Sequence, residues 1–366
     1  MRIEQKNIHR ATVLSGGLSS SLGMAYAVRM REQKLPKYLQ PMLATLVDAP
    51  FDDPKWVFET KWDGFRMVTE IRNGKVMLYS RNGQVVNERY AGVAKELGKV
   101  RHDCVLDGEL VAFDAHGRSR FQLLQNALRT KADLKYCIFD IMFLDGKDLR
   151  GSTLLERKEK LKSILPKNRL LQYSEHRFEH GKRFLKEAKA DREEGIMAKR
   201  AESTYLSGER SMEWQKIKTG ARQEVIIVGF TKPRRSRKYF GSLVIAVYDK
   251  KKLRYAGHVG TGFDFATLKE IHRKLAPLKV AKKPFDENVK YEDATTWVSP
   301  KLVGEVKFTE WTSGGEMRHP AFIGLREDKR AEEVSREVGS GARPERDGAR
   351  RGRAFRQQAK MRDMRE

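Results

Sequence analysis

The sequence predicts an α+β protein in which a larger domain of strands and helices precedes a small β-barrel. Three observations lead to this prediction. The chain has 366 residues, which is enough for two domains with substantial cores. Strand-like and helix-like segments are interspersed up to about Gly220. Beyond Gly220 the composition shifts to short strands separated by turns, with one helical segment among them.

Turn signals and apolar runs define the elements of the first domain. Residues 65–72 and 75–80 are expected to pair as a hairpin, because the Asn73-Gly74 pair between them favours a two-residue turn. A capping residue, Ser119, and apolar residues at helical spacing predict a helix that ends near Arg129. Further strands are expected at 56–58, 105–113, 136–144 and 194–199, and further helices at 154–165 and 178–190.

The second domain is expected to be a small barrel. Its predicted strands are 225–230, 242–248, 253–259 and 303–310, with one helix at 264–275. Short strands with a single helix are typical of five-stranded barrels of the oligonucleotide-binding kind. Residues 232–238 carry five cations in seven positions, so this loop either follows a phosphate backbone or is simply solvated. The candidates for DNA contact there are Arg234, Arg235, Arg237 and Lys238.

The charge balance restricts the partners of the protein. Lys and Arg total 74 against 49 Asp and Glu, a formal net charge of +25, which favours a polyanionic partner such as nucleic acid. Ribosome-associated and membrane-surface proteins share such a balance. No stretch is long and apolar enough to span a membrane, so no membrane association is expected. Cys104 and Cys137 lie in apolar runs and are expected to be buried thiols rather than a disulfide.

The two ends of the chain differ from its middle. Residues 1–37 hold basic residues followed by a stretch rich in small residues, which we expect to be a flexible N-terminal extension. A transit-like peptide is the alternative. From residue 331 to residue 366, Arg, Gly and Glu dominate and apolar residues are few, which predicts a basic disordered tail.

The motif around which the chain is organised is Glu59-Thr60-Lys61-Trp62-Asp63-Gly64-Phe65-Arg66. Lys61 is the candidate nucleophile. A lysine amine attacks phosphorus only when it is neutral, and burial or neighbouring cations lower the usual lysine pKa of ~10.4. Asp63 is placed to orient that amine or to hold a metal ion. Gly64 lets the backbone turn close to a bound nucleotide, and Arg66 can donate two bonds to ribose or phosphate oxygens.

Further charged residues occur in pairs on expected strands. Asp107 and Glu109 are two positions apart in an apolar strand, so they face the same side and need a cation or hydroxyl groups there. Lys216 and Lys218 would likewise share one face of a strand and suit a phosphate chain. Arg81 lies in a turn at the end of a sheet, where it either contacts a phosphate or is solvated.

Taken together, six segments in order resemble the covalent nucleotidyltransferases, which comprise ATP-dependent DNA ligases, RNA ligases and mRNA capping enzymes. The six segments are residues 61–66, 80–83, 107–109, 139–140, 194–199 and 214–218. Among these proteins, the ligase module of bacterial end-joining (NHEJ) DNA ligases is the most similar, through residues 255–263 and 318–329. Larger members of that group carry polymerase and phosphoesterase modules, for which this chain has no room, so a stand-alone ligase is expected.

The resemblance implies a fold and a reaction. The fold would be a nucleotidyltransferase (adenylation) domain of mainly antiparallel sheets with flanking helices over residues 38–221, followed by an OB-fold domain over residues 222–330. Lys61 would attack the α-phosphorus of ATP, release pyrophosphate and hold AMP as a phosphoramidate. AMP would then pass to the 5′-phosphate of a nick, and the 3′-hydroxyl would displace it and close the strand.

The resemblance also assigns roles to residues at the ATP site. The metal would be magnesium or manganese, which prefer oxygen ligands. For the nucleoside, the implied roles are adenine selection by Glu59, stacking on the base by Phe139, and ribose binding by Arg66 and Glu109. Glu194 would bind the metal together with Glu109, and Lys216 and Lys218 would neutralise the α-phosphate. Arg81 would contact the phosphate of the nick, and Arg326 and Lys329, with Asp328 as their partner, would orient the departing phosphates.

The expected partner is nicked double-stranded DNA, and family analogy adds a Ku-type end-binding protein. A monomer acting at the nucleoid in the bacterial cytoplasm is expected. Three alternatives remain at this level: an RNA ligase, a capping-type nucleotidyltransferase that uses GTP, and a nucleic-acid-binding protein without activity.

Overall fold

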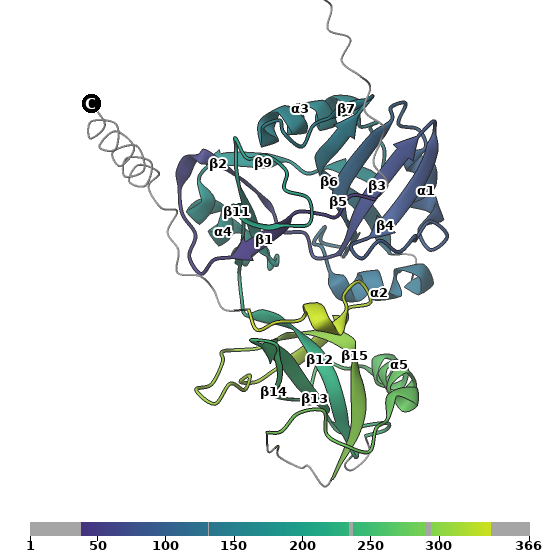
Figure 1. Cartoon of the computed structure of the whole chain (residues 1–366), viewed down its shortest axis with the longest axis vertical. Coiled ribbons are helices and arrows are strands. Elements are labelled where there is room, and N and C mark those ends of the chain that lie inside the picture. Colours follow the sequence, from purple (N-terminus) through teal and green to yellow (C-terminus); the bar gives the residue numbers. More distant parts are fainter. Residues whose placement is uncertain (1–37, 131, 234–236, 288, 290–293, 338–366) are drawn as a thin grey trace, which may run out of the picture. The chain divides into compact units, whose positions relative to one another are not determined.

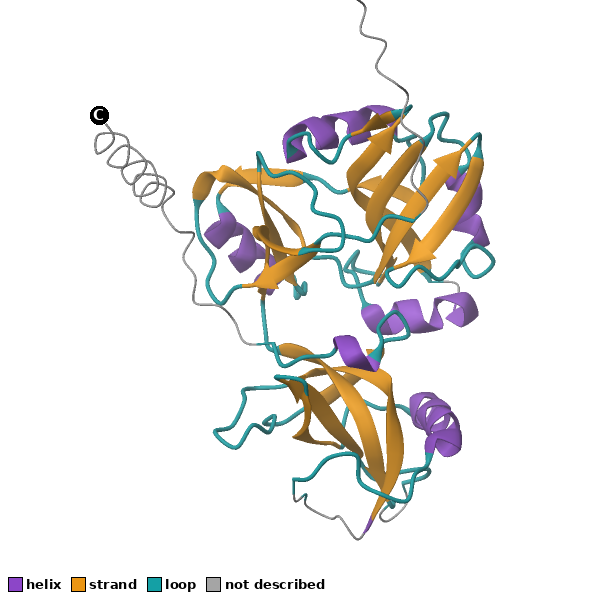
Figure 2. Cartoon of the chain, in the orientation of Figure 1, coloured by secondary structure: helices purple, strands orange, loops and turns teal. Residues whose placement is uncertain are grey.

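The computed structural model describes residues 38–337, except for residues 131, 234–236, 288 and 290–293. The N-terminal extension expected at residues 1–37 lies outside the described residues, as do residues 338–366 of the expected tail. Within the described part, the strands form three sheets, and helices cover sheet faces (Figure 1, Figure 2). None of the helices in this part is long and apolar enough to cross a membrane.

Two sheets come from the chain before Gly220. The first has the order β1-β11-β10-β2-β9, with β1 (Leu43–Leu46), β2 (Asp53–Thr60), β9 (His176–Glu179), β10 (Gly195–Arg200) and β11 (Arg210–Lys218). The second has the order β4-β3-β5-β6-β7, with β8 also paired to β6. Its strands are β3 (Phe65–Arg72), β4 (Lys75–Ser80), β5 (Cys104–Phe113), β6 (Asp133–Leu144), β7 (Lys147–Asp148) and β8 (Leu171–Tyr173). Among the strand pairs that the structure describes before Gly220, only β1 with β11 and β6 with β8 are parallel, so the prediction of mainly antiparallel sheets is confirmed.

The helices of this part are α1 (Ala91–Leu97), α2 (Phe121–Thr130), α3 (Leu154–Ile164) and α4 (Gly181–Ala190). Helix α3 begins with a capping box, in which Thr153 and Glu156 satisfy each other's backbone N–H groups. Two expectations were wrong. Ser119 does not cap α2, because its hydroxyl accepts from the Asp63 N–H and donates to Glu193. The helix expected at 178–190 starts at Gly181, because residues 176–179 join β2 as an edge strand.

The third sheet forms the predicted OB-fold. Its order is β14-β13-β12-β15-β16, with β12 (Arg222–Thr231), β13 (Leu243–Asp249), β14 (Lys252–Val259), β15 (Thr295–Lys307) and β16 (Ala321–Leu325). A parallel bridge between Thr261 and Ala321 connects the two ends of the sheet. Helix α5 (Phe265–Leu275), capped by Asp264, is followed by the short helix η1 (Ala276–Leu278). Strand β15 starts earlier than expected, because Trp297 and Val298 are buried in the barrel core.

The expected disorder from residue 331 onward is wrong for residues 331–337. These residues form the short helix η3 (Ala331–Glu333) and then return along the barrel. Val334 is 1% exposed and belongs to the barrel core, and Ser335 bridges to Tyr248. Buried Ala331 and Val334, together with backbone hydrogen bonds to Tyr248 and hydrogen bonds with the Gln223 side chain, hold this segment in place despite its polar composition.

The segment between β2 and β3 crosses β5 at very close range. A Cβ atom on Gly64 would lie 2.1 Å from the carbonyl oxygen of Leu110. This approach fixes residues 61–63 over the second sheet. Cys104 and Cys137 are free and buried in β5 and β6, so the prediction of buried thiols is confirmed.

We expect Gly64→Ala to lower the free energy of unfolding by about 1–3 kcal/mol, the usual cost of over-packing a close contact. A shift of the urea midpoint would measure it. The matched control is Gly151→Ala, where the added Cβ has nothing within 4 Å. That variant should stay within about 0.5 kcal/mol of the parent. Equal midpoints for the two variants would contradict the close approach at Gly64.

Candidate active site

One cavity of about 340 Å³ gathers the predicted site residues. It lies where the motif of residues 59–66 meets β10, β11 and the segment that follows β16. Every predicted site residue except the cations of the 232–238 loop lines it, and these are Glu59, Lys61, Asp63, Arg66, Arg81, Glu109, Phe139, Glu194, Lys216, Lys218, Arg326 and Lys329. Residues from seven separate parts of the sequence are therefore brought to one chemical site.

The Lys61 amine faces the Glu194 carboxylate. Lys61 follows β2, and its backbone N–H donates to the Gly195 carbonyl at 3.0 Å, which aligns the two strands. Its Nζ lies 2.5 Å from Glu194 Oε2, and the Lys61 side chain is 18% exposed. Burial acts to raise the pKa of Glu194, but Lys61, Arg222 and Lys218 outweigh it and hold that pKa below its ordinary value. The amine thus has an ionised partner and still opens to the cavity.

Asp63 has a different partner from the one expected. Its carboxylate accepts a bond of 2.9 Å from Arg222, the first residue of β12. Burial, together with repulsion from Glu194, raises the pKa of Asp63 to about 6. In this conformation Glu194, and not Asp63, contacts the Lys61 amine, and the expectation that Asp63 orients the amine or holds a metal ion stays a prediction.

Asp107 and Glu109, expected to share one face, have different surroundings. Arg66 donates two bonds to Asp107, at 2.5 and 2.6 Å, and Tyr205 donates a third. Glu109 is half-buried, and its carboxylate has no hydrogen bond or ion pair within the described residues. Burial raises the pKa of Glu109 to about 8, with Arg66 and Lys61 acting against the rise. A partly buried carboxylate without a side-chain partner, in a cavity that Glu194 also lines, suits a hard divalent cation.

Another part of the cavity, which we call the base end, carries an aromatic ring and a fully buried carboxylate, in contrast to the phosphate end, where Lys61, Lys216 and Lys218 lie. Phe139 is 7% exposed and Glu59 is 1% exposed. The Lys199 ammonium lies 4.3 Å from the centroid of the Phe139 ring and donates to Glu59 at 2.8 Å. Sequence analysis missed Lys199, although the 194–199 strand was expected to end in a lysine. It also missed Lys158, which donates to the same carboxylate at 2.7 Å.

At the end of the cavity where Lys216 and Lys218 lie, the cations are paired with acidic side chains. Lys216 and Lys218 both donate to Glu337, the Lys218 bond being 2.7 Å long. Burial lowers the pKa of Lys216 to about 8, with Glu337 acting against the fall. The sequence did not predict a role for Glu337, because Glu337 follows Val334, the last residue of its segment that packs in the barrel core.

The cations after β16 are also paired. Arg326 donates two bonds of 2.8 Å to Asp328, which confirms their expected pairing. Lys329 instead donates to Glu224 at 2.5 Å. Arg81 lies 3.5 Å from Glu333. Each of these cations therefore reaches the cavity with an acidic partner from the chain after residue 221.

The described cations of the basic loop do not line this cavity. Arg234 and Arg235 are outside the described residues. Arg237 donates to the Gly260 carbonyl at 2.7 Å and lies over the Phe263 ring. Lys238 is exposed, with its ammonium 5.9 Å from the centroid of the Phe265 ring. These two cations stand beside aromatic rings on the barrel.

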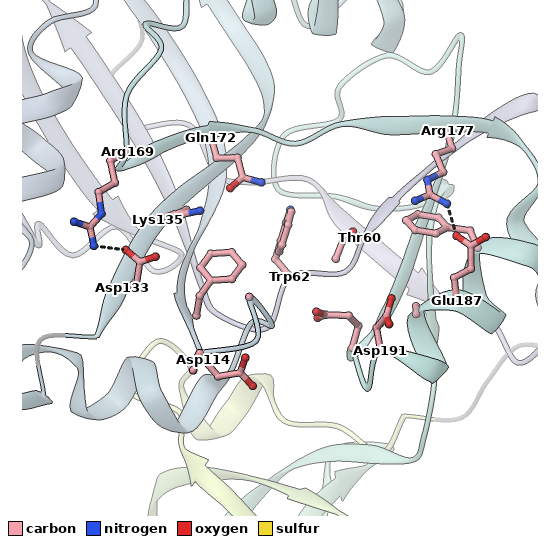
Figure 3. A pocket seen from close by; sticks show the side chains of 16 residues that line it. Thr60, Trp62, Asp114, Asp133, Lys135, Arg169, Gln172, Arg177, Glu187 and Asp191 are labelled. Carbon is pink, nitrogen blue, oxygen red and sulfur yellow. Dashed lines mark hydrogen bonds and ion pairs between the residues drawn. The ribbon is translucent and has the colours of Figure 1, made fainter.

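A second, larger cavity of about 720 Å³ is also lined by residues of the Lys61 motif, Thr60 and Trp62 (Figure 3). Trp62 and Phe113 form its apolar wall, with their ring centroids 5.9 Å apart. Two of its cations are already paired, Arg169 with Asp133 and Arg177 with Glu187. Five acids face three cations around it. This excess of negative charge does not suit a polyanion, so the smaller cavity is the candidate for a nucleotide.

A lysine amine in a cavity lined by cations, at the junction of a two-sheet domain and an OB-fold, defines a covalent nucleotidyltransferase. Comparison with protein families specifies the class. Residues 41–218 match the model of the ATP dependent DNA ligase domain, and residues 236–329 match the ATP dependent DNA ligase C terminal region. The chain belongs to the family of ATP-dependent DNA ligases.

The individual proteins to which the chain is similar also include a DNA ligase. The chain is 38% identical over 330 residues to the multifunctional non-homologous end joining protein LigD of Pseudomonas aeruginosa, covering 87% of this chain and 39% of that protein. It is 36% identical to the LigD DNA repair protein of Mycobacterium tuberculosis, covering 85% of this chain and 42% of that protein. The chain thus spans less than half the length of these relatives. A solved structure of mycobacterial DNA ligase D complexed with ATP and MES is similar at 35% identity, with a TM-score of 0.62, over 82% of this chain and 98% of that one.

We expect Glu337→Gln to tighten the binding of ATP. Glu337 holds both Lys216 and Lys218, so any phosphate that is to bind these lysines must displace it. A partly exposed ion pair is worth about 1 kcal/mol, so the dissociation constant for ATP should fall by about threefold to tenfold. Calorimetric titration of ATP would measure it, with Glu332→Gln, an exposed acid nearby, as the control. Weaker binding in Glu337→Gln would mean that Glu337 supports the site.

Proposed function

We propose that this chain seals 3′-hydroxyl/5′-phosphate nicks in double-stranded DNA, using ATP and a covalent lysyl-AMP intermediate. The observation that carries the proposal is the Lys61 amine, 2.5 Å from an ionised Glu194, in a cavity lined by nine further cations. The nine are Arg66, Arg81, Lys199, Arg210, Lys216, Lys218, Arg326, Lys329 and Arg336. Membership of the ATP-dependent DNA ligase family supports the choice of DNA and ATP.

In the first step Lys61 Nζ attacks the α-phosphorus of ATP, a P–N bond forms, and pyrophosphate leaves with the electron pair of the broken P–O bond. Glu194 is the group within reach of the proton on the amine. Lys216 and Lys218 neutralise charge on the α-phosphate once Glu337 has moved away. At the other end Glu59 accepts from adenine, Phe139 stacks on the base, and Arg66 contacts the ribose.

Glu109 and Glu194 are the residues that would hold magnesium or manganese. The unpaired Glu109 carboxylate supports this assignment. A bound divalent cation supplies charge neutralisation for the phosphate oxygens.

In the later steps AMP moves from Lys61 to the 5′-phosphate of the nick, and the 3′-hydroxyl then attacks that phosphate and expels AMP. Arg81 would hold the phosphate of the nick. The barrel cations Arg237 and Lys238, together with Arg234 and Arg235, would bind the DNA backbone. The excess of 25 positive charges over the chain supports a polyanionic substrate.

We assign residues 38–221 to an adenylation domain and residues 222–330 to an OB-fold domain. The separate sheets that contain β11 and β12 support a boundary between them. The end-joining proteins to which the chain is similar support a role in DNA break repair. By that analogy the protein would act as a monomer at the nucleoid in the cytoplasm, with a Ku-type end-binding protein as partner.

The direct test incubates the protein with radiolabelled ATP, magnesium and a nicked duplex. We expect a lysyl-AMP adduct and sealing of nicked DNA in preference to nicked RNA. Lys61→Ala should abolish both, because no other amine lies at that position. Lys55→Ala, an exposed lysine of the same strand, should change neither. An adduct mapped to another lysine, or labelling by GTP alone, would refute the proposal.

A second experiment separates the steps. Arg326 and Lys329 are proposed to orient the β- and γ-phosphates, which take part only in the first step. We therefore expect Arg326→Ala and Lys329→Ala to form little Lys61 adduct from ATP, yet to seal a nick that is already adenylated on its 5′-phosphate. Equal loss of both reactions would show that the two residues support the fold or bind DNA.

A further inference from the structure

The buried carboxylate of Glu59 is held from two sides. Lys158 Nζ donates to Glu59 Oε1 at 2.7 Å, and Lys199 Nζ donates to Glu59 Oε2 at 2.8 Å. Glu59 and Lys199 line the nucleotide cavity, whereas Lys158 does not. Lys158 comes from α3 and is 1% exposed. It therefore contacts the cavity lining through the Glu59 carboxylate and the backbone of Phe139, and does not line the cavity itself.

Lys158 is anchored independently of Glu59. Its ammonium group also donates to the carbonyl of Ser174 at 2.9 Å and to that of Phe139 at 3.4 Å. It lies 4.8 Å from the centroid of the Tyr173 ring. An ammonium has three protons, and each has an acceptor here. The carbonyl groups fix the position of Lys158, so the lysine sets the position of the carboxylate.

The charge balance at this point keeps Glu59 ionised. Burial alone would raise the pKa of Glu59, but Lys158 and then Lys199 outweigh it and lower the pKa below its ordinary value. An ionised carboxylate only accepts hydrogen bonds, whereas a protonated one also donates. With one lysine bond on each oxygen, both oxygens keep acceptor capacity for a group in the cavity. An acceptor there suits the amino group of adenine and repels the carbonyl oxygen that guanine carries at the same position.

We propose that Lys158 is a positioning residue that determines the preference for adenine, by holding Glu59 as a fixed acceptor for the 6-amino group. This inference rests on the proposed function. It adds a residue outside the cavity to the groups that read the base. A purely structural role for Lys158 would support the site equally for every nucleotide, so nucleotide selectivity separates the two possibilities.

The test compares Lys61 adduct formation from ATP and from purine riboside triphosphate, which lacks the 6-amino group. In Lys158→Met the rate with ATP at low concentration should fall by about 10- to 100-fold, the range for losing a hydrogen bond to a charged group. The rate with purine riboside triphosphate should change much less, so the ratio of the two rates falls toward one. The fraction of adduct formed from GTP should rise.

Two further variants make the result decisive. Lys162→Met removes an exposed lysine from the same helix, and its ratio should match the parent. Lys158→Arg keeps the charge, so it should retain more of the preference for ATP than Lys158→Met. If Lys158→Met does not fold, Lys158→Arg takes its place in the test. An equal loss with both nucleotides, or an unchanged ratio in both Lys158 variants, would overturn the proposal. Absence of any adduct from ATP in the parent protein would instead overturn the proposed function.

Discussion

The base end of the cavity, where Glu59 and Phe139 lie, depends on buried carboxylates that must be paired. Helix α3 supplies two consecutive cations, and each pairs with a carboxylate from a different sheet. Arg157 binds Asp140 of β6 at 2.8 and 2.9 Å, and Lys158 binds Glu59 of β2 at 2.7 Å. Removing one member of such a buried pair typically costs about 3–5 kcal/mol, since a charge is left without a partner. The geometry of the base end of the cavity therefore depends on α3.

The two ends of the cavity are built differently, and the difference suits the proposed reaction. At the base end, the charged groups find their partners within residues 38–221, as Glu59 does with Lys158 and Lys199. At the phosphate end, Lys61 has Glu194 as its partner, but the partners of the other cations come from the later chain, as with Lys216 and Glu337. The first arrangement keeps one geometry. The second can exchange protein acids for substrate phosphates, which a sequence of three phosphoryl transfers requires.

Much of the site could be predicted from the sequence, because strand alternation determines which residues share a face. Lys216 with Lys218 followed from this rule. The cations of α3 carried a signal too, since Leu154, Arg157, Lys158 and Leu161 have the i, i+3, i+4, i+7 spacing of one helix face. Charge at apolar positions indicates buried ion pairs, but their partners are distant in sequence. Glu337 could not be predicted, because its position depends on how Val334 packs against the barrel.

The carboxylates of the two ion pairs of α3 also differ in how many hydrogen bonds they accept from the protein. Asp140 does not line the cavity, and it accepts two bonds from Arg157 and one from the Ile141 N–H. Glu59 lines the cavity, and each of its oxygens accepts one lysine bond. Well-packed apolar residues often replace a buried ion pair without loss of stability, so stability alone does not account for either pair. Acceptor capacity left open toward a cavity distinguishes a pair that can bind a ligand, and Glu59 meets this condition whereas Asp140 does not.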